Sequence, residues 1–347
     1  MIRTVDFHFV IVRNGADYGQ LYPAQGSAPS VRMDANADVK TSLSGTFADI
    51  SRIDWLNDRI RPEIILDGVP HPAGIFLPAS VRWNETETAK TVILEAYDQC
   101  WLVDDKKTEN ILHLSAGTEY LSAIETLLTQ AGIALVIRTP SDAVLAEDRE
   151  DWEIGTSYLT IVNQLLSEIN YNPLWFDTGG AAVLEPASVP TAEHIEHTIN
   201  SDDPGCLMLP ALTKEVDVFS APNVFLCVCS NADKNAVMTA TSENTNPQSA
   251  LSIARRGRRI VQVEKLDNIA SQDELQAYAD RLRNESMITG EVFRIQTALE
   301  PGHGVNDVVA FHHGDETSIC LETSWSMQLG TGGTMTHQLK KVVFNLG

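Results

Sequence analysis

The sequence has few cysteines and no apolar run long enough to cross a membrane. Its five cysteines are an odd number without a secretory context, so we expect buried free thiols in a reducing cytoplasm and no disulfide framework. No stretch approaches the roughly 20 apolar residues of a transmembrane helix, so we expect no membrane insertion. Asp6 and His8 interrupt the first apolar run, which therefore does not resemble a signal peptide.

Basic residues are also scarce. The chain has 25 Lys and Arg against 47 Asp and Glu, which gives a formal net charge of −22. A non-specific nucleic-acid binder needs a basic face that displaces phosphate counterions, so this balance argues against that class. Such acidity favours solubility, and it would also suit a surface that repels DNA.

Motifs for covalent catalysis and phosphate binding are missing as well. No G-x-S-x-G elbow occurs, so no Ser-His-Asp or Cys-His arrangement is assigned. Gly302-His303-Gly304 and Gly330 to Gly333 do not follow a strand and open a helix, so we interpret them as turns. Asp104-Asp105 and the run from Glu147 to Asp151 offer the paired carboxylates of glycosidases, but consecutive charges in a turn normally face water. We predict no enzymatic activity, with a carbohydrate-active β-barrel protein as an alternative.

Two segments contain residue types that bind metals. His194-Ile195-Glu196-His197 is not an H-E-x-x-H motif, and no third ligand follows at a suitable spacing. Cys227-Val228-Cys229 would point both thiols to one face of a strand, but no second cysteine pair lies nearby. We interpret the first as an exposed polar segment and the second as buried thiols, and we predict neither a metal nor a cofactor.

The residues that are present predict a mainly β protein of two to four domains. A length of 347 residues with 43% hydrophobic residues is sufficient for several cores. In the first hundred residues, short alternating runs are separated by turn dipeptides such as Asn14-Gly15 and Asp67-Gly68, which is typical of a barrel or sandwich. The strands predicted here are Phe7 to Val12, Val31 to Met33, Asp38 to Phe47, Glu63 to Leu66, Gly74 to Leu77, Ser80 to Trp83 and Thr91 to Ala96.

From about Tyr97 the pattern becomes mixed. A helix is expected after Thr118, its predicted N-cap, and a second one near Ser157, because apolar residues recur at helical spacing. The Gly179-Gly180 pair between two apolar runs predicts a hairpin. The other elements expected are strands at Ile111 to Leu114, Leu174 to Phe176 and Ala181 to Leu184.

The last third returns to strands, interrupted by one helix. Ser271 to Glu274 form a capping box that opens a helix ending near Met287, and the polar stretch from Ser230 to Ser249 is interpreted as a long loop. The predicted strands are Glu215 to Phe219, Asn223 to Cys229, Glu291 to Thr297, Asp307 to Phe311, Ser318 to Met327 and Thr334 to Phe344.

Arg255, Arg256, Arg258 and Arg259 form the only basic cluster. Four arginines could bind phosphate, but in a chain of net charge −22 they fit better on an acidic surface of a partner or of another copy. A solvated strand end is the other reading. We interpret these four residues as a possible assembly interface.

Several segments resemble the central hub proteins of bacteriophage tails, of the T-even and Mu type, which also occur in related contractile injection systems. Residues 90–133 resemble the point where such hubs leave their first barrel: a strand, then Tyr97-Asp98, a polar turn and a helix. Residues 151–180 resemble the helix and hairpin of the second domain. Residues 220–224, 298–311 and 324–342 resemble the segment entering the second barrel, a Pro-Gly turn into a strand, and the closing hairpin.

The resemblance implies an α+β, mainly β fold with two tail-tube-like antiparallel β-barrels, each with an attached α/β domain. The domains expected are a first barrel at 1–96, an α+β domain at 97–190, a second barrel at 191–240 and 290–347, and an inserted helix-containing domain at 241–289.

The resemblance also implies a function, namely a homotrimeric tail or baseplate hub in the virion, assembled in the cytoplasm of the bacterial host. The expected partners are a hexameric tail tube or distal tail protein above and a spike or tip protein below, with DNA passing through without specific binding. A distal tail or tube-type protein is the alternative within this class, and it would form hexamers with one barrel per subunit.

Overall fold

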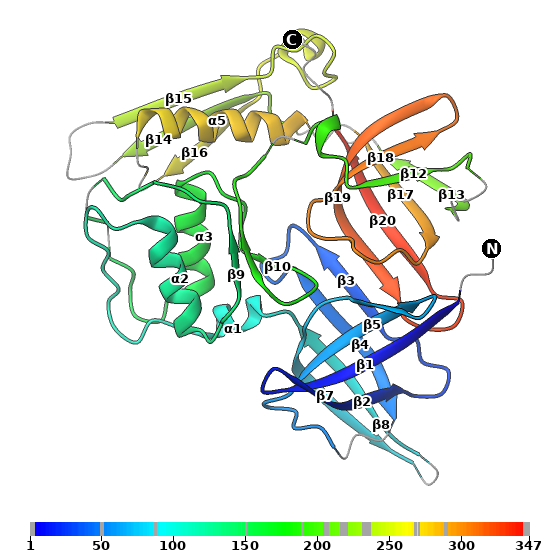
Figure 1. Ribbon diagram of the computed structural model, residues 1–347. Coiled ribbons are helices and arrows are strands. Elements are labelled where there is room, and N and C mark those ends of the chain that lie inside the picture. The colour runs from blue at the N-terminus through cyan, green and yellow to red at the C-terminus, as the bar shows by residue number, and fades with distance from the viewer. Residues whose placement is uncertain are drawn as a thin grey trace.

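The computed structural model describes residues 4–342 except 49–51, 87–88, 147, 150, 189, 204–207, 216–220, 231–236, 267–268, 270 and 288–290. Its strands form one 14-stranded sheet and two three-stranded sheets, and the helices cluster in two places (Figure 1). This confirms a mainly β chain with a large, mostly antiparallel sheet. None of the described helices is long and apolar enough to span a membrane.

The N-terminal strands follow the predicted alternation and turns. Asn14 and Gly15, with φ of 51° and 77°, make the tight turn between β1 and β2, and Asp67 and Gly68 do the same between β5 and β6. The strands are β1 (Val5–Arg13), β2 (Ala16–Pro23), β3 (Ser30–Asp34), β4 (Thr41–Ala48), β5 (Arg59–Leu66), β6 (Val69–Pro72), β7 (Leu77–Glu85) and β8 (Lys90–Tyr97).

Three local predictions in this region were wrong. The prediction missed β2, because only Leu21 in it is buried and no alternation is visible. It also missed β6, whose two prolines are tolerated because it is the edge strand of the sheet. The strand expected at Gly74 to Leu77 does not form as predicted: Gly74 has a φ of 118°, Phe76 makes a single bridge to Ile60, and Leu77 begins β7.

The C-terminal strands join the same sheet through β19. The first part of β19 pairs with β18 and its last part, from Ser324 to Gln328, pairs with β3, so residues 290 to 298 positions apart in sequence are neighbours. The path among the described strands ends at β6 and β13 and does not close into a barrel. These strands are β12 (His197–Asn200), β13 (Met208–Glu215), β17 (Val292–Ala298), β18 (Val308–His313), β19 (Glu316–Gln328) and β20 (Thr334–Lys341).

One core is shared by the two halves of this sheet. Phe9, Met33 and Phe47 from the first half pack in the same cluster as Trp325 and Met335 from the second. The predicted strand from Glu215 to Phe219 falls largely outside the described residues, and β13 ends at Glu215.

The middle of the chain forms a separate helical region, seen at the left of Figure 1. Helices α2 and α3 pack together, and Ile124, Leu128, Ile161 and Leu165 are fully buried between them and their neighbours. The strand expected at Ile111 to Leu114 is reduced to one bridge between Leu112 and Trp152. The elements are α1 (Cys100–Asp105), α2 (Tyr120–Gln130), β9 (Val136–Arg138), α3 (Tyr158–Glu168), β10 (Trp175–Phe176) and β11 (Ala182–Leu184).

A second small sheet carries its own helix. Strand β14 pairs with β15 and β16, and α5 packs on β14 and β15 over a core that includes Cys227, Ala240 and Leu275. The prediction of a loop from Ser230 to Ser249 is therefore wrong in part, because β15 forms within it. Met238, Ala240 and Ser242 face the inner side of this strand, which is otherwise largely polar. The elements are β14 (Val224–Ser230), β15 (Val237–Glu243), α4 (Ile253–Arg256), β16 (Val261–Leu266) and α5 (Gln272–Met287).

Half of the predicted capping box is present on α5. The Glu274 backbone N–H donates to Ser271 Oγ at 3.1 Å. The Glu274 carboxylate does not return to the cap but accepts a hydrogen bond from Asn170 Nδ2 at 2.6 Å, which ties α5 to the end of α3.

Candidate functional site: a buried histidine and carboxylate network

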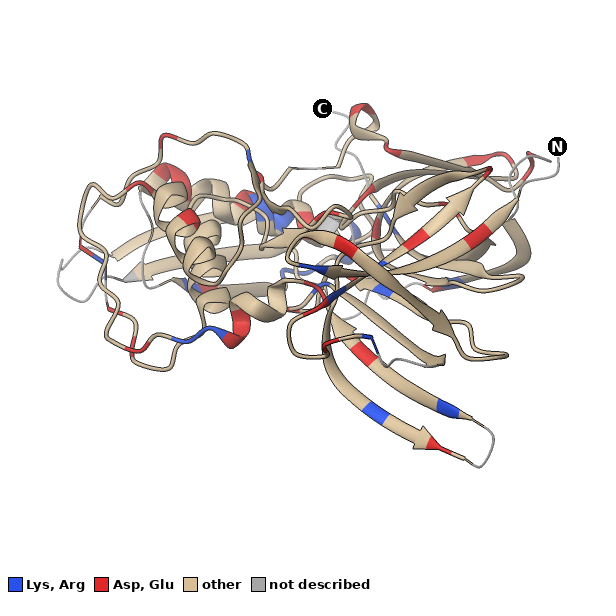
Figure 2. Cartoon of the chain, turned by 60° about the horizontal axis from the view of Figure 1, so that its bottom comes forward, with Lys and Arg blue, Asp and Glu red and all other residues tan. Residues whose placement is uncertain are grey.

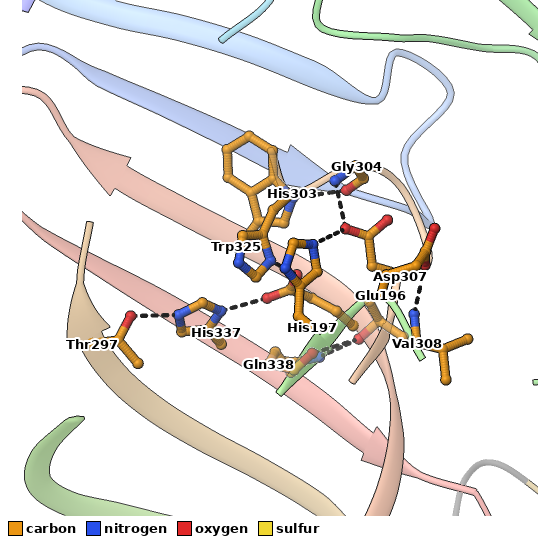
Figure 3. A network of polar contacts seen from close by, with 12 residues as sticks. Glu196, His197, Thr297, His303, Gly304, Asp307, Val308, Trp325, His337 and Gln338 are labelled. Atoms are coloured by element: carbon orange, nitrogen blue, oxygen red, sulfur yellow. Dashed lines mark hydrogen bonds and ion pairs between the residues drawn. The ribbon is translucent and has the colours of Figure 1, made fainter. Parts of the chain in front are cut away.

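Three histidines and two carboxylates meet beneath the C-terminal strands (Figure 3). His337 occupies an inward position of β20 between the buried Met335 and Leu339. Glu322 lies on β19 at a register shift against β20, a bulge that turns both Glu322 and Thr323 inward. The loop between β17 and β18 supplies the remaining members, His303 and Asp307, and β12 supplies His197.

The Glu322 carboxylate connects two of the histidines. Its Oε2 lies 2.6 Å from His303 Nδ1, and its Oε1 lies 2.5 Å from His337 Nδ1. All three side chains are at most 1% exposed. The other nitrogen of His337, Nε2, lies 2.8 Å from Thr297 Oγ1 on β17. The network therefore joins three strands and one loop.

A second pair lies next to the first. His197 Nε2 is 3.1 Å from Asp307 Oδ2, which also accepts the Gly304 backbone N–H at 2.7 Å. The His197 and His303 rings stack with 3.7 Å between centroids and 7° between planes. The Gly304 carbonyl in turn accepts from Trp325 Nε1 at 2.8 Å, so the loop is fixed to β19 directly after His303.

The local electrostatics favour the charged forms of Glu322 and His197. Burial alone would raise the pKa of Glu322, but the hydrogen bonds from His303 and His337 outweigh burial and lower it. Burial opposes the charged form of His197, but the hydrogen bond to Asp307 and the charges of Asp307 and Glu322 raise its pKa.

The arrangement fits a hydrogen-bond network that stabilises the fold, or a metal centre, better than it fits covalent catalysis. The Thr297 hydroxyl beside His337 donates its hydrogen to the Ala298 carbonyl at 2.8 Å, so His337 does not take that hydrogen. Two groups bring three ligand atoms within 4.8 Å of one another: His197 with His303 and Asp307, and His303 with Glu322 and His337.

Solved structures of tail proteins share this fold over nearly the whole chain. A tail protein from Neisseria meningitidis MC58 is 13% identical, with a TM-score of 0.67 and coverage of 97% of each chain. The 43 kDa tail protein of prophage MuSo2 from Shewanella oneidensis is 12% identical, with a TM-score of 0.64 over 97% of this chain and 98% of that one. The chain has the fold of phage tail proteins.

The tail-protein fold extends to secretion machinery. An Escherichia coli component of the type VI secretion system, which itself has structural similarity to the T4 bacteriophage tail proteins gp27 and gp5, is 11% identical. Its TM-score is 0.50 over 99% of this chain and 75% of that one. A scan against protein-family models and a search of curated proteins gave no match to the sequence.

Within the tail-protein fold, the four arginines of the basic cluster have different surroundings. Arg256 ends α4 and donates to the Ala221 carbonyl at 2.5 Å, and Arg259 pairs with Glu243 at 2.7 Å. Arg255 and Arg258 are exposed on either side of Gly257, which has a φ of 63° and ends the helix. Two of the four arginines thus have partners within the chain, and Arg255 and Arg258 are exposed to solvent.

The remaining candidates are separated from one another. His194 lies in a 3-10 turn beside Thr191, away from His197, which joins the buried network. Asp104 pairs with Lys107, and Asp148 accepts from the Ala116 backbone N–H. Glu147, Glu150 and Cys206 lie outside the described residues. Cys100, Cys227, Cys229 and Cys320 are buried.

The sequence reasoning missed the central residues, Glu322, His303 and His337. One signal was available: Glu322 and His337 occupy inward positions in strands whose neighbouring inward positions are apolar. A charged residue at such a position must find a buried partner. The turn interpretation of Gly302 to Gly304 gave no reason to expect a buried ring there.

Proposed function

We propose that this protein is a structural component of a phage tail or of a related injection machine, and that it is the hub joining the tail tube to the central spike. The observation that carries the proposal is the agreement in fold with two tail proteins, over 97% of this chain and 97% and 98% of theirs. One fold can host unrelated functions. The extent of the agreement, which includes both halves of the large sheet and the helical region, therefore matters more than any single shared element.

The proposed partners follow from this role. A hexameric tail tube or distal tail protein would bind above and a spike or tip protein below, in a virion tail assembled in the host cytoplasm. The similarity of the Escherichia coli secretion component to gp27 and gp5 supports a position next to a spike. The tail proteins of similar fold support a structural rather than an enzymatic role.

Two barrel-like halves would allow three subunits to match a sixfold tube. In the first half, the path β4-β2-β1-β5 returns through β7 and β8 to β4 if the bridge between Ile60 and Phe76 is included. Each of these residues donates its N–H to the other's carbonyl at 2.8 Å. This supports a first barrel at residues 1–96.

The other domain boundaries are proposed with one revision. The α+β domain occupies 97–190, and the second barrel contains β12, β13 and β17 to β20. We place the start of the inserted domain near residue 221 instead of 241, because β14 and β15 pair with β16 and not with the large sheet.

The acidity of the chain suits a channel through which DNA slides. Acidic positions occur on helices, loops and strands alike (Figure 2), against a net charge of −22. At physiological salt, repulsion reaches only about 8 Å, so acidic residues would have to line the bore itself. We propose transient passage of DNA without specific binding.

Light scattering on the purified full chain tests the proposal. A homotrimer has a mass of about 114 kDa, three times 38.1 kDa, and negative-stain images of the same peak should show rings. A hexamer would assign the protein to the tube or distal-tail class instead. A species that stays at 38.1 kDa at high concentration and in the presence of a partner tail protein would contradict the hub.

A further inference from the structure

We propose that Glu322, His303 and His337 bind a divalent transition-metal ion of the zinc class, an ion that braces the C-terminal strands. This site is independent of the proposed tail function. It rests on which donors and acceptors of the network are paired, on the burial of the three residues and on the kinds of ligand atom that they offer.

The first step concerns His337. The Thr297 hydroxyl donates to the Ala298 carbonyl at 2.8 Å, so Thr297 Oγ1 is left to accept a hydrogen from His337 Nε2, also at 2.8 Å. A neutral His337 then presents the lone pair of Nδ1 to Glu322 Oε1 at 2.5 Å. Two lone pairs at that distance repel, so a positive charge must hold these two atoms together. It is either a proton between the two atoms or a metal ion to one side of them that both atoms bind at about 2.0 to 2.2 Å.

The second step concerns His303. Its Nδ1 approaches the other oxygen of the same carboxylate at 2.6 Å, while its buried Nε2 has no hydrogen-bond partner among the described residues. His303 is therefore not held by hydrogen bonds on both nitrogens, as His337 is. If its hydrogen is on Nε2, a neutral His303 presents the lone pair of Nδ1 to a metal ion.

The third step is the donor set. Two imidazole nitrogens and one carboxylate converge to within 4.8 Å of one another, and two histidines with one glutamate are a recurrent zinc ligand set. Thr297, bonded to the far nitrogen of His337, is the kind of outer partner that orients a ligating histidine. All three ligands are at most 1% exposed, which suits a structural ion better than a catalytic one.

The second group lies toward solvent. His197, whose side chain is 15% exposed, stacks on His303 and is held by Asp307. His197, His303 and Asp307 also meet within 4.8 Å, so a donor set adjoins the buried one on its outer side. We infer that an ion reaches Glu322 past His197.

Zinc binding by the untagged full chain tests the proposal. After stripping with a chelator, the chain is given ZnCl₂, passed over a desalting column and analysed for metal content. We expect one zinc ion per chain and a thermal midpoint that rises by a few degrees with zinc but not with Mg²⁺, because an ion that binds only the folded state stabilises it. No retained zinc and no shift would overturn the proposal and leave His337 as a buried imidazolium.

Matched histidine variants locate the ion. His303→Ala should weaken zinc binding by about 100-fold or more, because it removes one of three protein ligands. The double variant His312→Ala/His313→Ala removes an adjacent pair at the end of β18 and should bind zinc like the wild type. Zinc lost with the double variant and kept by His303→Ala would place the ion on the surface and refute the buried site. If His303→Ala does not fold, the visible spectrum of the Co²⁺-loaded wild type decides: a spectrum without imidazole-nitrogen ligands contradicts the proposal.

Discussion

Buried charges away from the histidine network also shape this protein at the scale of single residues. Glu168, at the end of α3, is 9% exposed at its side chain and lies 2.7 Å from Arg149. It accepts a hydrogen bond from Tyr120 on α2 at 3.0 Å. Burial raises its pKa from 4.5 to about 7, although the charge of Arg149 and the bond from Tyr120 oppose the shift. Between about pH 4.5 and 7, Glu168 is therefore protonated in the folded protein and ionised in the unfolded chain.

Glu168 predicts a pH-dependent stability. A raised pKa in the folded state contributes stability that is present below about pH 4.5 and lost as pH rises through about 7. We expect Glu168→Gln to remove this decline, which amounts to an order of 3 kcal/mol over the window. Urea unfolding at several pH values between 4.5 and 8 measures it. Glu125→Gln, on α2, is the control and should keep the wild-type slope; identical slopes in all three proteins would refute the assignment.

Short-range residue chemistry was predictable from the sequence, and long-range chemistry was not. Asn14-Gly15 specifies its turn within two residues. The partners in the histidine network, in contrast, are 15 to 110 positions apart, and only the pairing of β19 with β20 and of β12 with β18 brings them together. Asp98 is a similar case. The sequence singled it out as part of Tyr97-Asp98, but it did not predict that the Asp98 carboxylate accepts from the backbone N–H groups of Thr41 and Cys100.

At the scale of elements, the N-cap predicted for one of the two central helices is present and the N-cap predicted for the other is not. Ser157 has an extended backbone and its Oγ accepts from the Thr160 N–H at 3.0 Å. Thr118 was the predicted cap of α2, but that helix starts one residue later, with Glu119 in the cap position and no side-chain cap bond. Both threonine and serine satisfy the sequence rule, and only the backbone conformation distinguishes them.

The two helix starts should respond differently to alanine. Ser157→Ala removes a hydrogen bond to an otherwise unpaired N–H and should cost about 1 kcal/mol of stability. Thr118→Ala should change stability by less than about 0.5 kcal/mol, because no cap bond is lost. Chemical denaturation of both variants beside the wild type measures the difference. An equal loss from both changes would mean that Thr118 caps α2 after all.

Strand prediction was reliable where a strand has one buried face. β8 alternates with Val92, Leu94 and Ala96 inward and was found. β15 was missed because its inward face includes a serine, and β6 because prolines are expected only at an edge whose position the sequence does not reveal.

At the scale of the whole molecule, β19 decides the architecture. It is 13 residues long. Its first part pairs with β18 of the C-terminal half, and its last part pairs with β3 of the N-terminal half. The resemblance to hub proteins implied two barrels. Their junction could not be predicted, because no local pattern marks which outer strand of one half pairs with the other.

Assembly is the property that the whole molecule should show most directly. Arg255 and Arg258 are exposed, so an acidic surface of another copy can reach them, whereas Arg256 and Arg259 are engaged with Ala221 and Glu243. We expect Arg255→Ser/Arg258→Ser to weaken the proposed trimer, with a lower mass by light scattering at dilute concentration. The difference from the wild type should shrink at high salt, because salt already screens the ion pairs of the wild type.

Arg256 and Arg259, which contact Ala221 and Glu243 within the chain, provide the contrast. Arg256→Ser/Arg259→Ser should lower the thermal stability of the small sheet more than the exposed pair does, because it removes contacts within the subunit. Arg138→Ser, in the helical region, removes one exposed cation that pairs with Glu125 and should leave the mass unchanged. If the exposed double variant keeps the wild-type mass at every concentration, Arg255 and Arg258 have no part in assembly. The acidic partner surface would then have to be sought elsewhere, since the cluster's two other arginines are already engaged within the chain.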